Sequence, residues 1–162
     1  MRAFIAILLV ATSARVHAAE WRGVRAQSAA PADFALHIEA MCGDTIDTTG
    51  ASLQRMTSAG PVSASVPMTA VRMAQLFELV EAAQLFAYPA RYNPPFEGGF
   101  AVPYPIYKIQ VQLAGRRHEF EWHAMGIATP EAKRLSQFVR AAYAVFQAEP
   151  AVQGLPPGRP CI

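Results

Sequence analysis

The strictest constraint on the fold is a long alternation of apolar and polar residues late in the chain. Residues 107–123 read YKIQVQLAGRRHEFEWH. The alternation runs through both halves and breaks only at Ala114-Gly115, which is typical of two half-buried strands joined by a tight turn. A two-residue turn pairs Ile109 with Phe120, whereas a three-residue turn would point charged residues at the core. The segment therefore predicts a β-hairpin with one apolar and one polar face.

Two further segments repeat apolar residues at helical spacing. Residues 69–86 and 129–149 each place them three or four positions apart, which predicts two amphipathic helices. Thr69 and Thr129 stand where a side-chain oxygen can cap a helix, and Pro130 suits the first helical position. The expected apolar stripes are Met73, Leu76, Phe77, Val80 and Ala83 in the first helix, and Leu135, Phe138, Val139, Ala142 and Phe146 in the second.

Strands are also predicted before the first helix. Residues 33–41 alternate as a half-buried strand does, and residues 52–57 and 62–67 are weaker strand candidates. Residues 44–50 are polar and predict turns. The chain is therefore expected to have an α+β fold, in the order β-β-β-α-β-β-α, with an antiparallel sheet of four to five strands and two helices packed on one face.

The N-terminus has the pattern of a cleavable signal peptide. One arginine precedes nine apolar residues, 3–11, a run too short to cross a bilayer, which takes about 20 residues. Small side chains then lead to a cleavage site after Ala18. We expect a signal peptide over residues 1–18, a flexible leader over 19–33, one domain over 34–148 and a Pro/Gly-rich tail over 149–162. The mature chain would be periplasmic or secreted, without a transmembrane anchor.

Cleavage would also change the charge balance. The full chain has 14 Lys and Arg residues and 12 Asp and Glu residues. Arg2 and Arg15 would leave with the signal peptide and no acidic residue would, so that 12 of each sign remain. A nucleic-acid partner is not expected, because such binding requires a clustered basic surface.

The two cysteines, Cys42 and Cys161, would reach an oxidising compartment on export, where a disulfide between them is expected. It would close a loop of about 120 residues and contribute about 4 to 5 kcal/mol in the chain-entropy model. It would also tether the tail to the end of the first strand. A reactive thiol is the disfavoured alternative, because neither cysteine lies in a CxxC motif.

Residues 87–105 hold five prolines and five aromatic residues, which predicts a long irregular loop. Tyr92, Phe96 and Phe100 in this loop could serve as rigid anchors for a partner. The alternative is that aromatic residues of the loop cover one edge of the core, and this alternative is favoured.

The polar face of the hairpin is the second candidate surface. Glu119, Glu121 and His123 share that face, and His37 and Glu39 would join them if the first strand belongs to the same sheet. Imidazole and carboxylate groups can bind zinc or transfer protons. The simpler interpretation is a solvated sheet face with Lys108 opposite Glu121. His118 lies on the apolar face and is expected to be structural.

No catalytic, metal-binding or cofactor-binding residue is assigned, because the chain has no helical HExxH, GxSxG or SxxK motif and no Gly-rich loop between a strand and a helix. We therefore expect an exported non-enzymatic module that binds a protein or envelope component through the polar sheet face or the aromatic loop, or that is associated with the envelope. The alternative function is a small metal-dependent or hydrolytic enzyme that uses Glu119, Glu121 and His123.

The order of the segments FALHIEAMCG, TAVRMAQLFELVEAAQLF, YKIQVQLAGRRHEFEW and TPEAKRL resembles that of small secreted bacterial α+β domains of unknown function. The resemblance covers residues 34–146. This chain departs from it at residues 44–50, DTIDTTG, where those domains have a second Cys and a Tyr. The resemblance implies the fold and export, and it implies no site.

Overall fold

The hairpin is present in the structure, a computed structural model of the chain. β6 (Ile106–Leu113) and β7 (Arg116–His123) pair antiparallel around Ala114 and Gly115. Both turn residues have positive φ, 50° and 72°, as two-residue hairpin turns favour. Their backbone N–H groups donate to the carboxylate of Asp33, at 3.2 and 2.6 Å. The predicted register is confirmed, because each strand residue faces the partner that an even turn requires.

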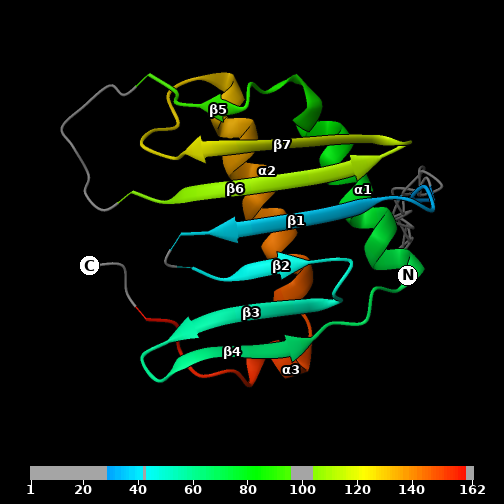
Figure 1. Cartoon of the computed structure of the whole chain (residues 1–162), viewed down its shortest axis with the longest axis vertical. Coiled ribbons are helices and arrows are strands. Elements are labelled where there is room, and N and C mark those ends of the chain that lie inside the picture. The colour runs from blue at the N-terminus through cyan, green and yellow to red at the C-terminus, as the bar shows by residue number, and fades with distance from the viewer. Residues whose placement is uncertain (1–28, 42, 96–103, 160–162) are drawn as a thin grey trace, which may run out of the picture.

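The structure describes residues 29–41, 43–95 and 104–159. Within them lie seven strands, three α-helices and a short 3-10 helix, η1 (Figure 1). The elements besides the hairpin are β1 (Ala35–Ala40), β2 (Thr45–Asp47), β3 (Ser52–Thr57), β4 (Gly60–Ser65), α1 (Ala70–Ala83), η1 (Leu85–Ala87), β5 (Arg91–Tyr92), α2 (Pro130–Gln147) and α3 (Pro150–Gln153).

The strands form one sheet in the order β4-β3-β2-β1-β6-β7-β5. The α+β class is confirmed, but the prediction of four to five antiparallel strands and two helices is wrong. β5 makes the sheet mixed, because it runs parallel to β7. β2 and β5 are three and two residues long and lie in segments predicted to be irregular. The third helix, α3, begins at Pro150, where the second helix was expected to stop and the tail to begin.

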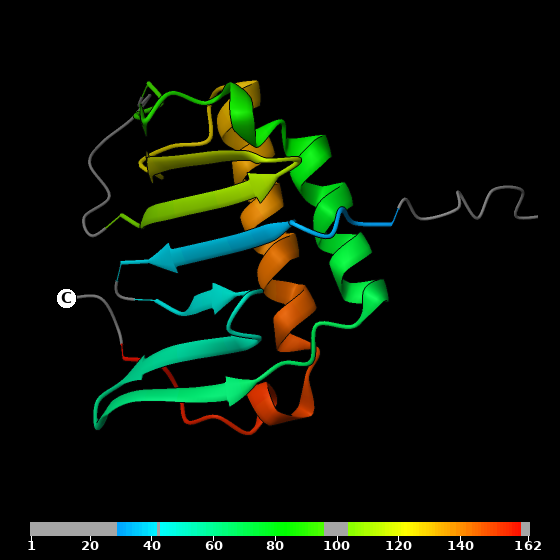
Figure 2. The same cartoon turned by 45° about the vertical axis from the view of Figure 1, so that its right-hand side comes forward.

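Both long helices pack on one face of the sheet and leave the other face uncovered by helices (Figures 1 and 2). The predicted caps are confirmed. The Thr69 hydroxyl accepts from the N–H of Arg72 at 3.3 Å, and the Thr129 hydroxyl accepts from the N–H of Ala132 at 3.1 Å. Pro130 occupies the first turn of α2, where its missing N–H is not needed.

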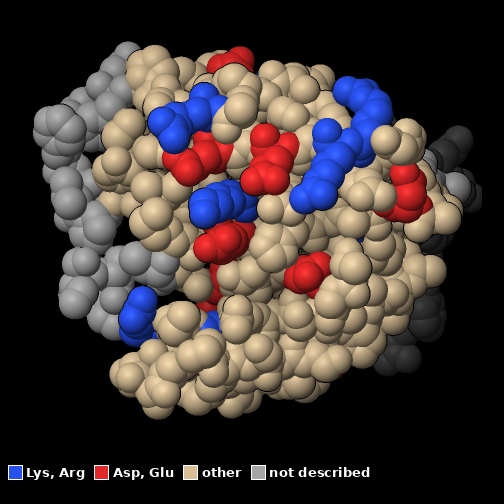
Figure 3. Space-filling view, viewed as in Figure 1, with Lys and Arg blue, Asp and Glu red and all other residues tan. Residues whose placement is uncertain are grey.

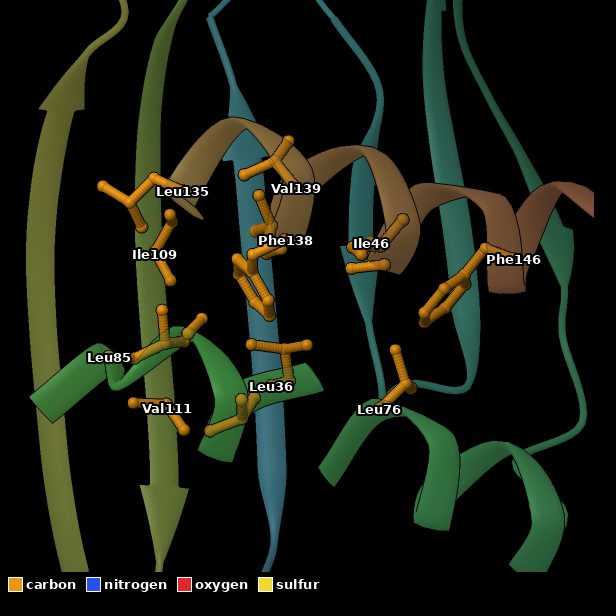
Figure 4. Close-up of a cluster of buried hydrophobic side chains, with 14 of the residues drawn as sticks. Leu36, Ile46, Leu76, Leu85, Ile109, Val111, Leu135, Phe138, Val139 and Phe146 are labelled. Atoms are coloured by element: carbon orange, nitrogen blue, oxygen red, sulfur yellow. The ribbon is translucent and has the colours of Figure 1, made fainter. Parts of the chain in front are cut away.

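The core lies between the sheet and these two helices. Side chains from β1, β2 and β6 meet side chains from α1 and α2 in a single apolar layer (Figure 4). All five residues predicted for the stripe of α2 are buried. In α1, Met73 and Phe77 are only half-buried, and Ala74 is buried instead.

The chain segments next to the domain are held against it. Ala30 packs on the core, and the N–H of Phe34 donates to the carbonyl of Pro31 at 3.0 Å, so order begins before residue 33. In the tail, the N–H of Arg159 donates to the carbonyl of Met56 at 2.9 Å. The tail therefore lies along β3 in the part of the chain that the structure describes.

Residues 1–18, the predicted signal peptide, lie outside the described residues. Cys42 and Cys161 lie outside them as well, and no disulfide is present among the residues that are described. The signal peptide and the Cys42–Cys161 bond therefore stay predictions.

Candidate functional site

The sheet face without helices, called the open face below, carries polar side chains in rows that cross the strands. One row consists of Ser63, Gln54, Thr45, Glu39, Lys108, Glu121 and Arg91. A second row consists of Ser65, Ser52, Asp47, His37, Gln110 and Glu119. The prediction that His37 and Glu39 share a face with Glu119, Glu121 and His123 is confirmed by this register. Charged side chains gather over β1, β6, β7 and β5, whereas the part over β3 and β4 is nearly uncharged (Figure 3).

Glu121 is the centre of the charged part. Its Oε1 accepts a hydrogen bond from Nε2 of His123 and lies 3.5 Å from Nε of Arg91. Lys108 faces it across the β6–β7 pair. The hydrogen bond from His123, followed by the positive charges of Arg91 and Lys108, lowers the pKa of the Glu121 carboxyl. Groups on β5, β6 and β7 therefore keep the carboxylate of Glu121 ionised.

The remaining predicted residues of the open face are more loosely placed. Nδ1 of His37 lies 3.8 Å from Oδ2 of Asp47, its cross-strand neighbour. Glu39 is exposed opposite Lys108, and Glu119 is exposed opposite Gln110. These side chains stay available to water or to a partner.

Two hollows open on this face. One, of about 460 Å³, is lined by Arg91, Lys108, Glu119 and Glu121, with Ala90 and Phe120. The other, of about 230 Å³, is lined in part by His37, Asp47, Gln110 and Arg117. Nη2 of Arg117 donates to Oε1 of Gln110 at 3.3 Å beside the second hollow. Both hollows are shallow depressions with polar rims.

The aromatic loop is divided by the structure. Tyr88 is buried, stacks on Phe120 at 5.3 Å and donates its hydroxyl to the carbonyl of Glu131 at 3.0 Å. Tyr92 packs edge-on against Tyr88, and its hydroxyl shares a 3.0 Å hydrogen bond with the Thr129 hydroxyl. These contacts favour a structural role for the described part of the loop. Phe96 and Phe100 lie outside the described residues.

His118 occupies the structural position expected for it. Its Nε2 is 2.9 Å from the carbonyl oxygen of Tyr88, and its ring stacks between those of Phe86 and Phe120. Because its polar and aromatic surfaces are already engaged, we assign it no role at the site.

Several polar residues of the open face were not among the sequence candidates, among them Arg91, Asp47 and Gln110, which line its hollows. Arg91 lies in a proline-rich segment with no strand pattern, and Asp47 lies in a segment predicted to be turns. Gln110 belongs to the confirmed hairpin, so the alternation of β6 already placed it on the polar face. Gln110 could therefore have been predicted from the sequence if neutral polar residues had been counted as candidates.

The open face holds no assembled metal centre. Among the described residues, no group of three or more His, Cys, Asp or Glu side chains is placed to hold a metal ion. The same part of the chain contains no helix with the length and apolarity needed to cross a membrane.

Comparison of the chain with protein-family models, with curated protein sequences and with solved structures finds no match. A functional proposal therefore has to rest on the geometry of the open face.

Proposed function

We propose that this chain is an exported, non-enzymatic binding module that holds an envelope or extracellular protein on the open face of its sheet. The observation that supports it is the row Glu39, Lys108, Glu121 and Arg91, in which negative and positive side chains alternate across four strands. Strands hold these groups in a fixed spacing, so little order has to be gained on binding.

The alternating charges favour a partner with the opposite pattern. Charged groups across an interface set register and exclude wrong partners more than they add affinity. The hollow beside Lys108 and Glu119, of about 460 Å³, can receive one side chain of the partner. A protein surface with its own mixed charges and one protruding side chain fits this face.

A charge swap tests the proposal. Lys108→Glu combined with Glu119→Lys places a third carboxylate between Glu39 and Glu121, which breaks the alternation of the row, and leaves the net charge unchanged. A photo-crosslinker at Gln110 in living cells is expected to trap a defined partner in the parent chain, and the swap is expected to abolish that product. The melting temperature should change little, because both side chains are exposed.

The matched control is Lys133→Glu combined with Glu81→Lys, which swaps exposed charges on the helical side of the molecule. This control should keep the crosslink. A crosslink that survives the open-face swap, or that is lost equally in the control, would contradict the proposal.

Export is tested separately on the full chain. We expect protein from the periplasmic fraction to begin at Ala19 by N-terminal sequencing, and Cys42 and Cys161 to resist thiol labelling until a reductant is added. An intact N-terminus in the cytoplasmic fraction would refute export. Two free thiols in the exported protein would refute the disulfide alone.

A hydrolytic enzyme is the second candidate, because one specific contact favours it. The hydrogen bond from His123 to Glu121 orients the imidazole, as a carboxylate does beside a general base. Ester hydrolysis by the purified chain, compared with a folded His123→Gln variant, separates the two functions. Turnover that disappears in the variant would favour the enzyme, and turnover that does not depend on His123 would reject it.

A further inference from the structure

A further cavity, separate from the two hollows of the open face, lies where β6 begins and β7 ends. This cleft has a volume of about 450 Å³ and lies between the two strands, the segment that follows β7 and helix α2. Its wall includes Tyr107 and Trp122 from the sheet, Ile127 from the connecting segment, and Val139, Arg140 and Tyr143 from the helix. Its volume is within the range of pockets that take small molecules, about 300 to 1,000 Å³.

Apolar side chains form part of the wall of the cleft. The rings of Tyr107 and Trp122 stack with centroids 5.2 Å apart, and Val139 faces the cleft from α2. Ile127 is 54% exposed, one of three large apolar side chains so exposed in the described residues. An apolar body that covers these side chains would gain from the loss of their contact with water.

Two polar groups that line the cleft, the indole N–H of Trp122 and the guanidinium of Arg140, are relevant to binding. Trp122 is 2% exposed, and its indole N–H is buried without a hydrogen-bond partner among the described residues. A buried donor without an acceptor loses its hydrogen bonds to water and gains none in return. Arg140 is exposed, and it makes no ion pair within the part of the chain that the structure describes.

Among the described residues that line the cleft, Ser136 and Gln147 have side chains that can accept a hydrogen bond, and none has a negatively charged side chain. The hydroxyl of Tyr143 is already engaged, because it donates to the carbonyl of Asp44 at 2.5 Å. The described part of the cleft therefore combines apolar side chains with a buried N–H donor that lacks an acceptor, on Trp122, and a positive charge without an ion pair, on Arg140.

We propose that this cleft binds a small apolar carboxylate. The apolar body lies against the Tyr107–Trp122 stack and Ile127, the carboxylate pairs with the guanidinium of Arg140, and a ligand oxygen accepts from the indole N–H of Trp122. The site is independent of the open face, so either proposal can fail without the other.

Phenylbutyrate and its neutral primary amide are suitable probes. The chain has two tryptophans, Trp21 and Trp122, so a Trp21→Phe variant of the mature chain leaves Trp122 as the single indole N–H signal in a ¹H–¹⁵N spectrum. We expect phenylbutyrate to shift this signal downfield in a saturable titration, because a new acceptor deshields the proton. The amide should bind at least about threefold more weakly, since an exposed ion pair contributes up to about 1 kcal/mol, or fivefold.

Arg140→Gln should weaken phenylbutyrate binding by the same factor and leave amide binding unchanged. Lys133→Gln is the matched control, because it removes a positive charge from the same helix without lining the cleft. Trp122→Phe keeps an aromatic ring and removes the N–H, so a folded variant should bind more weakly than the parent.

The proposal is overturned if the Trp122 signal does not shift saturably, if the acid and the amide bind equally, or if Lys133→Gln weakens binding as much as Arg140→Gln. A tripeptide with a free C-terminal phenylalanine, compared with its amidated form, distinguishes a peptide terminus from a free acid as the source of the carboxylate. Tighter binding of the free peptide than of phenylbutyrate would assign the site to a chain terminus.

Discussion

The two faces of the sheet are made by the same strands and are used differently. In β6, Ile109 is fully buried under the helices, whereas its neighbour Lys108 is exposed on the open face. The covered face contains interlocking apolar side chains, and the open face contains charges that partner one another in water. Because successive side chains of a strand point to opposite faces, stability and surface chemistry can change independently in this protein.

The largest expected difference between the faces is a pair of substitutions at adjacent positions. Ile109→Ala should lower the free energy of unfolding by about 2–5 kcal/mol, because it leaves a cavity between sheet and helices. Lys108→Ala should change it by less than about 0.5 kcal/mol. Urea unfolding of both variants measures the contrast. Equal losses would show that the open face is part of the cooperative structure.

A second contrast compares two arginine–carboxylate pairs. Nη2 of Arg55 lies 2.7 Å from Oδ2 of Asp44, and the two side chains are only 17% and 16% exposed. Nη1 of the same arginine also donates to the carbonyl of Pro156 in the tail, at 3.4 Å. On the open face, Arg91 pairs with Glu121 at 3.5 Å, and its side chain is 69% exposed.

Arg55→Met should lower the free energy of unfolding by about 1–3 kcal/mol, because it leaves the partly buried carboxylate of Asp44 without its partner. Arg91→Met should cost less than about 0.5 kcal/mol, because water screens the exposed pair. Thermal and urea unfolding give both values. An Arg91 variant as unstable as the Arg55 variant would mean that burial does not separate the two pairs.

The covered face could be predicted from the sequence, and most of the open face could not. Side chains that pack on a core repeat with the period of their element, and this periodicity predicted the hairpin and the apolar stripe of α2. β2 has a single buried residue, Ile46, and part of its pairing is continued by the hydroxyl of Thr48, which accepts from the N–H of Leu36 at 2.8 Å. Such short pairing leaves no periodic signal.

The row of Glu39, Lys108, Glu121 and Arg91 was likewise only partly predictable from the sequence. Lys108 opposite Glu121 followed from the hairpin register, which depends on local alternation. Arg91 joins the row only because β5 pairs with β7 over two residues, within a segment that has no strand pattern. The cleft beside Trp122 could not be predicted either, because it depends on how α2 packs against the ends of β6 and β7 in three dimensions.

The stability that Asp33 contributes at the turn between β6 and β7 should depend on pH. Backbone hydrogen bonds, with that from Gly115 the strongest cause, lower the pKa of Asp33. A carboxyl whose pKa is lower in the folded state contributes stability above its unfolded pKa, about 3.9, and that contribution is lost as the pH falls through the folded value. Asp33→Asn should therefore be less stable than the parent near neutral pH, and the gap should narrow below about pH 4. Urea midpoints across this range test it, and a constant gap would contradict it.

The smallest effect is expected within the open face itself. His123→Phe keeps a ring but removes the hydrogen bond to Glu121, the largest cause of the low pKa of that carboxyl, so the pKa should rise toward its ordinary value. Lys108→Gln should raise the same pKa less, because Lys108 is the weakest of the contributing groups. Titration of the Glu121 carboxyl carbon by NMR measures both. Equal rises would mean that charge alone, without the hydrogen bond, keeps Glu121 ionised, and that the open face is a diffuse charged surface with no organised pair at its centre.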